Sequence, residues 1–275
     1  MTTTAADIDL RASLALGLLQ GPTELLPVSS SGHLVLAPWL LRSSYTELDP
    51  ELRKSFEVAL HAGTAAALLI VLHEEVSEAI SDLDLRRIEL MLLSFLPAAI
   101  TALTFERLIE RRSGDPRVVA CGMIAGSLAM LLADRAPEVR DRADADWRDG
   151  LALGIAQSCA LMPGVSRNGA TLVAARLRGF RRADANALSR HSALPVIAGA
   201  VVLKGVRLAR RRPQGIARPF TVGAVASFVS SLASARLIAS FERRSALTPY
   251  AIYRLGLAAI TLVVAAKRRS NDPIV

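Results

Sequence analysis

The sequence has few aromatic residues, only two cysteines and no basic leader. Phe, Trp and Tyr together make up 4% of its 275 residues. Cys121 and Cys159 both lie in apolar runs, and neither belongs to a CxxC motif, which argues against a disulfide framework or a cysteine metal site. The segment from Met1 to Arg11 carries acidic residues where a signal peptide would be basic, so we expect it to remain uncleaved.

The sequence is instead rich in small and aliphatic residues. Hydrophobic residues make up 52% of the chain, and charged residues cluster between the apolar segments. This pattern predicts a polytopic helical membrane protein, in which small residues such as Gly122 and Gly126 let helices approach closely. The net charge of +8 lies mainly in short loops, which favours contact with anionic lipid headgroups over binding of nucleic acid.

Six apolar stretches approach the length of about 20 residues that a helix needs to cross a bilayer. Charged loops separate them, as expected for a chain that crosses the membrane repeatedly. The predicted spans are Phe56 to His73, Ile88 to Phe105, Val118 to Ala133, Ser192 to Leu208, Phe220 to Ser240 and Pro249 to Ala266.

Two further apolar regions are too interrupted for one straight spanning helix. Leu10 to Leu41 contains Pro22 and Pro27, and Leu151 to Leu177 contains Pro163, each accompanied by glycines. Broken backbone at membrane depth is tolerated only where protein or a water-filled cavity satisfies its polar groups. We therefore expect each region to form a re-entrant helical hairpin that enters and leaves on one side.

The two interrupted regions also resemble each other. Leu14 to Gln20 matches Leu151 to Gln157, and at the same offset Val28 to Gly32 matches Val165 to Gly169. These matches predict an inverted repeat, in which each half is a re-entrant helical hairpin followed by three transmembrane helices. The basic residues divide almost evenly between the two predicted faces, so the positive-inside rule leaves the orientation open.

The predicted fold is thus an all-α polytopic membrane protein that forms a single integral membrane domain over residues 1–275. Repeat one covers about 10–133, a loop follows over 134–149, and repeat two covers about 150–267. The hairpins would enter from opposite faces and meet near the midplane, which is where inverted-repeat proteins build their sites.

The first hairpin carries a concentration of reactive side chains. Glu24 follows Gln20 by four residues, so both face the same side of a helix, where a carboxylate can bind a divalent cation or act as a base. Three serines, residues 29–31, precede Gly32 and His33, and a hydroxyl beside an imidazole can be an activated nucleophile. Alternatively, Glu24 is a polar surface residue and the serines only cap the next helix.

The second hairpin has the composition of an anion site. Its glycines, Gly164 among them, let backbone amides approach an anion, and Arg167 offers a planar fork for phosphate oxygens. An arginine at the midplane needs a partner, either a substrate phosphate or the carboxylate of the first hairpin. A purely structural pair with that carboxylate is the alternative.

Other polar residues in the expected spans have weaker assignments. His61 in the first span is a candidate cavity-lining residue, and His191 at the start of the fourth span is another. Arg254 lies close to the start of the last span, and we expect it to extend to the headgroups.

At these residues the chain resembles the bacterial undecaprenyl pyrophosphate phosphatase family, also known for bacitracin resistance. One family marker is a Glu/Gln-x-x-x-Glu motif that leads into Pro-Val-Ser-Ser-Ser/Thr-Gly-His, here Gln20 to His33. The other is Pro-Gly-x-Ser-Arg-Ser-Gly-x-Thr, here Pro163 to Thr171, with Asn168 in place of the usual Ser. The resemblance extends to a first-span segment, Phe56 to Thr64, and to Tyr253-Arg254.

The resemblance implies an integral plasma-membrane enzyme that hydrolyses undecaprenyl diphosphate to the monophosphate carrier used in peptidoglycan synthesis. It implies an active site open to the outer face and a divalent cation, Mg²⁺ or Ca²⁺. Catalytic roles then fall to Glu24, Ser30, His33 and Arg167. Either Ser30 or His33 would be the nucleophile, and we favour Ser30, activated by His33 or Glu24.

The remaining roles follow from the same two markers. Glu24 would bind the metal, with Gln20 as a weaker, neutral ligand where other members have a second carboxylate. A homodimer is also compatible with the sequence. Substrate-binding roles are expected for Ser29, Ser31, Gly164, Ser166, Asn168 and Thr171.

Two other functions compete with this interpretation. The acid-phosphatase-like lipid phosphatases also use Pro-Ser-Gly-His, but they need a histidine and an aspartate soon after a Ser-Arg pair. Here no histidine follows Arg167 until His191, which argues against that family. A polyprenyl-phosphate transporter or flippase of the same architecture stays open, because inverted repeats are common in transporters.

Overall fold

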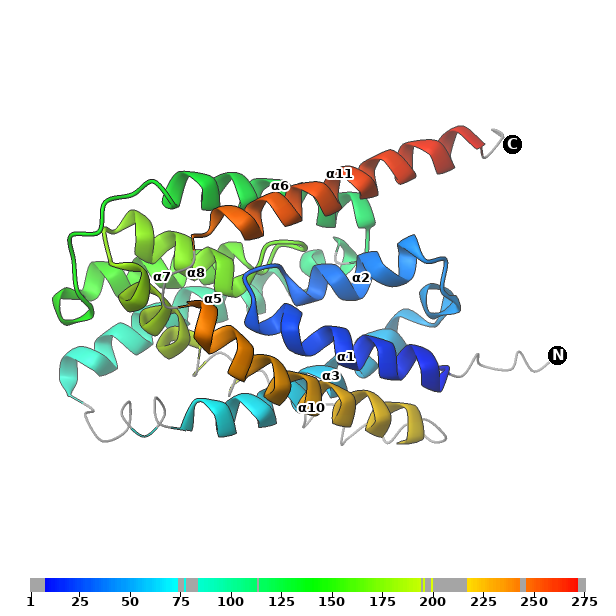
Figure 1. Ribbon diagram of the computed structural model, residues 1–275, viewed down its shortest axis with the longest axis horizontal. Coiled ribbons are helices and arrows are strands. Elements are labelled where there is room, and N and C mark those ends of the chain that lie inside the picture. Colours follow the sequence, from blue (N-terminus) through cyan, green and yellow to red (C-terminus); the bar gives the residue numbers. More distant parts are fainter. Residues whose placement is uncertain are drawn as a thin grey trace.

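The computed structural model describes residues 8–73, 84–112, 114–193, 217–242 and 246–271, together with positions 77, 195 and 199. Within these residues every regular element is a helix, apart from an isolated bridge between Arg140 and Phe180 (Figure 1). The prediction of an all-α protein is therefore confirmed.

Each of the two interrupted regions forms a pair of helices. The first region gives α1 (Leu10–Leu25) and α2 (Ser30–Leu40), which run in opposite directions side by side in Figure 1. The second gives α7 (Trp147–Cys159) and α8 (Arg167–Leu177), which also pack together. The breaks fall at 26–29 and 160–166, so the interruptions predicted from proline and glycine are present.

Four helices are long and apolar enough to cross a membrane in the described part of the chain. This establishes the coarse expectation of a membrane protein with several apolar helices. The four segments are Pro50–Val71 in α3 (Pro50–Val71), Leu85–Phe105 in α5 (Leu85–Arg112), Pro116–Ala133 in α6 (Pro116–Ala133) and Thr248–Ser270 in α11 (Thr248–Asn271). The predicted span from Ser192 to Leu208 lies almost entirely outside the described residues.

The predicted span from Phe220 to Ser240 lies within α10 (Ala217–Glu242), which is not among those four helices. Its hydropathy is reduced by serines that face other helices. Ser230 donates a hydrogen bond to the carbonyl oxygen of Gly17 at 3.0 Å, and the Ser227 hydroxyl lies 2.6 Å from that of Thr64. Polar groups of this kind join helices within a membrane protein.

Helix α1 packs against α10, and α7 packs against α5. A glycine permits each contact. A Cβ added to Gly17 would lie 2.5 Å from the carbonyl oxygen of Gly223, and one added to Gly154 would lie 2.3 Å from that of Leu93. Only the absence of a side chain lets the backbones approach this closely.

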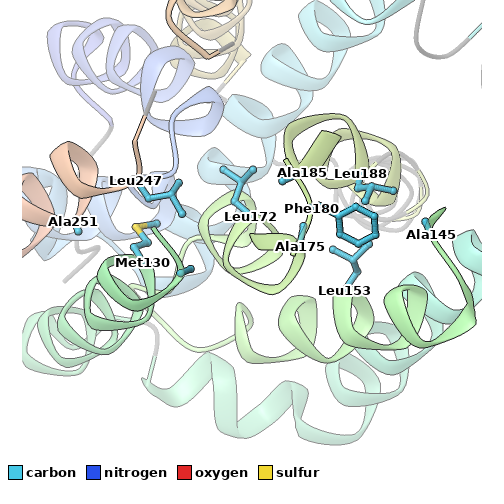
Figure 2. Close-up of a cluster of buried hydrophobic side chains, with 11 residues drawn as sticks. Met130, Ala145, Leu153, Leu172, Ala175, Phe180, Ala185, Leu188, Leu247 and Ala251 are labelled. Carbon is cyan, nitrogen blue, oxygen red and sulfur yellow. The ribbon is translucent and has the colours of Figure 1, made fainter. Parts of the chain in front are cut away.

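A hydrophobic cluster joins α6, α7, α8 and α11 (Figure 2). Phe180 lies beside Leu153 and Leu188 in this cluster, and Met130 lies near Leu247 (Figure 2). These contacts hold the second helix pair against the two long helices, and so position the turn between α7 and α8.

Charged residues hold the loops at one end of the bundle. Asp134 accepts hydrogen bonds from Arg182 and from the amides of Leu247 and Thr248. Partial burial raises the pKa of Asp134, but these hydrogen bonds outweigh it and lower the value to about 2. Arg182 is therefore a structural ion-pair partner that fixes the start of α11.

Candidate functional site

The carboxylate of Glu24 lies where the two helix pairs meet. Ser30 donates a hydrogen bond to its Oε2 at 2.5 Å, and Arg167 donates one to its Oε1 at 3.1 Å. Ser30 and Arg167 are the first residues of α2 and α8. Residues from both helix pairs, 143 positions apart in the case of Glu24 and Arg167, thus converge on one acidic group.

Equivalent serines cap the two helices that begin at this carboxylate. Ser29 accepts a hydrogen bond from the amide of Gly32 at 3.3 Å, and Ser166 accepts one from the amide of Gly169 at 3.1 Å. Each serine hydroxyl satisfies one of the amides left unpaired at a helix N-terminus. The capping alternative is therefore observed for Ser29 and Ser166, while Ser30 is directed to Glu24.

Helix N-termini carry partial positive charge, so both α2 and α8 favour an anion where they begin. The guanidinium of Arg167 adds a full charge at the same place, and its side chain is 23% exposed. An anion can therefore reach this group. The arrangement suits a ligand with several negative oxygens, such as a phosphate.

Two more polar residues surround Glu24. Nε2 of Gln20 lies 3.3 Å from Oε2 of Glu24 and 3.1 Å from Nδ1 of His61. His61 is itself 3.7 Å from the carboxylate, so this histidine, expected only to line a cavity, belongs to the cluster. Gln20 is fully buried, and its Oε1 has no hydrogen-bond partner among the described residues.

Two further predicted residues of the second helix pair, Asn168 and Thr171, make hydrogen bonds that hold α8 in place beside the site. Asn168 donates a hydrogen bond to the carbonyl oxygen of Leu25 at 2.8 Å and accepts one from Ser189 at 3.0 Å. Thr171 is buried and lies 2.6 Å from the Ser189 hydroxyl. Asn168 therefore ties α8 to the end of α1, whereas Ser31 on α2 is exposed.

The sequence left open whether His33 or Glu24 activates Ser30, and the hydrogen bonds connect Ser30 to Glu24. His33 uses its own ring nitrogens elsewhere. Nδ1 lies 2.8 Å from the carbonyl oxygen of Ser29, and Nε2 lies 2.8 Å from the hydroxyl of Tyr253. No motif or spacing predicted the contact between His33 and Tyr253, which lie 220 positions apart.

The prediction that Arg254 extends to the headgroups is wrong. Its side chain is fully buried and donates hydrogen bonds to the carbonyl oxygens of Pro27 and Gly164, both at 3.1 Å, and to that of Met123 at 3.4 Å. The carbonyls of Pro27 and Gly164 belong to the two turns that break the helix pairs. Because these buried backbone acceptors need hydrogen-bond donors, the guanidinium of Arg254 lies inward and joins both turns to α11.

Close backbone contacts hold the second turn against α6. A Cβ added to Gly122 would lie 2.0 Å from the carbonyl oxygen of Pro163, and one added to Gly126 would lie 2.5 Å from Nη2 of Arg254. Gly164 itself has a φ of +85°, a conformation that favours glycine. Gly164, predicted as a substrate-binding residue, therefore shapes the turn and accepts the Arg254 hydrogen bond.

Replacing Arg254 is expected to destabilise the protein. Arg254→Met keeps much of the side-chain volume but removes the donors to three carbonyl groups, and leaving buried polar groups unpaired costs about 1–3 kcal/mol for each group. We expect thermal unfolding in detergent at a clearly lower temperature. Arg269→Met, on the exposed side of the same helix, is the control and should unfold like the wild type. Equal unfolding temperatures for all three proteins would contradict this role of Arg254.

Comparison with known proteins assigns the chain to a family. The family described as "Bacitracin resistance protein BacA" matches residues 13–260. An undecaprenyl-diphosphatase of Geobacter sulfurreducens is 38% identical over 262 residues, which cover 90% of this chain and 95% of the relative. Undecaprenyl-diphosphatase 2 of Stutzerimonas stutzeri is 33% identical over 272 residues, covering 94% and 98%. The chain therefore belongs to the bacitracin resistance protein BacA family.

Proposed function

We propose that this protein hydrolyses undecaprenyl diphosphate to undecaprenyl phosphate and inorganic phosphate in the bacterial cell membrane. The curated relatives are named undecaprenyl-diphosphatases, and the family is named for bacitracin resistance. The observation that carries the proposal is the convergence of Ser30 and Arg167 on Glu24. Product release would recycle the lipid carrier for peptidoglycan synthesis.

The geometry supports Ser30 as the nucleophile and Glu24 as its base. The Ser30 hydroxyl already donates to Oε2 of Glu24 at 2.5 Å, so its proton can pass to the carboxylate as Oγ attacks the terminal phosphorus. The bond from that phosphorus to the bridging oxygen breaks, and undecaprenyl phosphate leaves. Water then attacks the phosphoserine, Glu24 returns its proton to Ser30 Oγ, and the second water proton goes to a phosphate oxygen.

Arg167 and the two helix N-termini would stabilise charge during this transfer. Arg167 is paired with Glu24 in the structure. An incoming diphosphate competes for its guanidinium, which binds phosphate oxygens in a planar fork. Release of Arg167 would leave the carboxylate of Glu24 free to accept the Ser30 proton, so substrate binding would itself prepare the base.

Purified protein in detergent is expected to release inorganic phosphate from a prenyl diphosphate in the presence of Mg²⁺. Ser30→Ala removes the attacking oxygen and Arg167→Ala removes the fixed positive charge, so each should lower turnover at least about 100-fold. Ser31→Ala, beside the nucleophile but exposed, is the matched control for Ser30. A wild-type protein that moves the lipid between leaflets of liposomes without releasing phosphate would establish the transporter alternative instead.

The residues around Glu24 fit a divalent cation such as Mg²⁺ or Ca²⁺. The Glu24 carboxylate and the unpartnered buried Oε1 of Gln20 are hard oxygen donors on one helix face. The described residues contain no cluster of three His, Cys, Asp or Glu side chains, so further ligands would be phosphate oxygens and water, as is common for Mg²⁺. When bound, the cation would neutralise charge on the transferring phosphoryl group.

Gln20→Glu tests this metal site. A second carboxylate raises affinity for a hard cation, so we expect the Mg²⁺ concentration for half-maximal activity to fall about tenfold. Without Mg²⁺ two neighbouring carboxylates repel each other, and the variant should gain more thermal stability from Mg²⁺ than the wild type does. Gln157→Glu, at the matching position of the second helix pair, is the control. The same response to Mg²⁺ in all three proteins would exclude Gln20 as a ligand.

We further propose the inverted repeat, with the site open to the outer face of the membrane. Residues separated by 137 positions have matching environments, which supports a duplication. Ser29 and Ser166 both cap helices, and Gly17 and Gly154 both permit close helix contacts. The first turn of α1 and the last turn of α11 also lie at the same end of the molecule in Figure 1, as an inverted repeat with three spans per half requires. The homodimer stays a prediction.

Cysteine labelling tests the topology and the orientation. Cys121 and Cys159 are both exposed, so both are first replaced by alanine. Single cysteines at Ser43, which follows α2, and at Ala136, which follows α6, are then exposed to a membrane-impermeant maleimide in intact cells. These positions should lie on opposite sides, so only one should react until the cells are opened. Equal labelling of both positions in intact cells would contradict the proposed crossings.

A further inference from the structure

Both ring nitrogens of His33 are held by oxygen atoms. Nδ1 lies 2.8 Å from the carbonyl oxygen of Ser29, which can only accept a hydrogen bond, so Nδ1 carries a proton. In the neutral ring Nε2 is then an acceptor, and it receives the hydroxyl proton of Tyr253 at 2.8 Å. The two contacts together select one tautomer of the imidazole.

The rings of His33 and Tyr253 are also parallel. Their centroids are 5.7 Å apart and their planes differ by 3°. His33 is only 4% exposed, whereas Tyr253 is 50% exposed. The phenol therefore connects a buried imidazole with the more open side of α11.

No other described group takes the role of Tyr253 at Nε2. The proton of Ser30 goes to Glu24, as the hydrogen bond between them shows. Arg254 is the charged neighbour of the imidazole, but its terminal nitrogens donate to backbone carbonyls of the two turns. Among the described groups, the hydroxyl of Tyr253 is therefore the hydrogen-bond partner of Nε2.

We infer that Tyr253 is a positioning residue that couples His33 to the bound diphosphate by reversing their hydrogen bond. With His33 neutral, Tyr253 donates its proton to Nε2. When Nε2 takes up a proton from water, it donates to the Tyr253 oxygen, and the phenol proton turns to the exposed side. There it can donate to a phosphate oxygen. The only bond formed on either residue is the N–H bond at Nε2 of His33, and the O–H bond of Tyr253 is kept. The inference rests on the proposed phosphatase function.

Tyr253→Phe isolates the hydroxyl, because phenylalanine preserves the ring that stacks on His33. We expect turnover to fall about tenfold or more, as for the loss of one hydrogen bond to a charged group, with an unchanged unfolding temperature. Tyr45→Phe is the matched control: Tyr45 packs in a separate cluster, and its hydroxyl makes only a 3.5 Å contact. Full turnover by Tyr253→Phe would overturn the inference.

A spectroscopic measurement tests the pairing independently of activity. In protein labelled with ¹⁵N-histidine, the signals of His33 are assigned by their absence from His33→Asn, among the four histidines of the chain. The wild type should show a protonated Nδ1 and an unprotonated Nε2, and Tyr253→Phe should shift the Nε2 signal.

A protonated Nε2 with a bare Nδ1 in the neutral wild-type ring would overturn the inference, as would an unchanged Nε2 signal in Tyr253→Phe. The wild-type spectrum decides even if the variant fails to fold. Absence of phosphate release by the wild type would instead count against the proposed function, and the spectrum would still report whether Tyr253 holds His33.

Discussion

The guanidinium of Arg254, which pairs with no carboxylate among the residues that the structure describes, holds the two helix pairs in place. Burying the Arg254 charge in a low-dielectric interior is costly, and the cost is offset only if nearby oxygens accept its protons. Those oxygens are the carbonyls of Pro27, Gly164 and Met123. The carbonyls of Pro27 and Gly164 need a donor from outside their helices because they lie in the turns where the helices are broken. Each partner thus satisfies the other, and the broken backbone becomes stable through the arginine.

The positions of the reactive groups follow from this arrangement. Because both turns are fixed to one side chain, the helices that begin after them start close together. Their first residues, Ser30 and Arg167, then reach the same carboxylate of Glu24. A shift of one turn would move a helix N-terminus and its charge away from that carboxylate. The precision of the site therefore depends on Arg254, whose hydrogen bonds go to the two turns and to Met123 and not to Glu24.

Much of this could be predicted from sequence, because the signals were local. Prolines and glycines identified the interruptions, and polar residues in apolar surroundings identified Glu24 as one of two candidate partners of Arg167, the other being a substrate phosphate. The buried position of Arg254 could not be predicted, because its distance from a helix end says nothing about the carbonyl groups that its side chain faces. The partner of His33 was also inaccessible, because Tyr253 approaches it only through the packing of α11. The assignment of Ser30 to Glu24 likewise required knowledge of how α2 leaves its turn.

The two matching segments contribute different side chains to the site, and the chemistry of the site explains this difference. Two pairs of matching positions keep their residue type in both segments: the helix caps Ser29 and Ser166, and the buried Gln20 and Gln157. Gln157 donates to backbone carbonyls of Ser94 and Ser192, whereas Gln20 faces a carboxylate. Where Ser30 stands in one segment, Arg167 stands in the other. A single acid needs one hydroxyl and one cation, and two identical helix starts could not have supplied both.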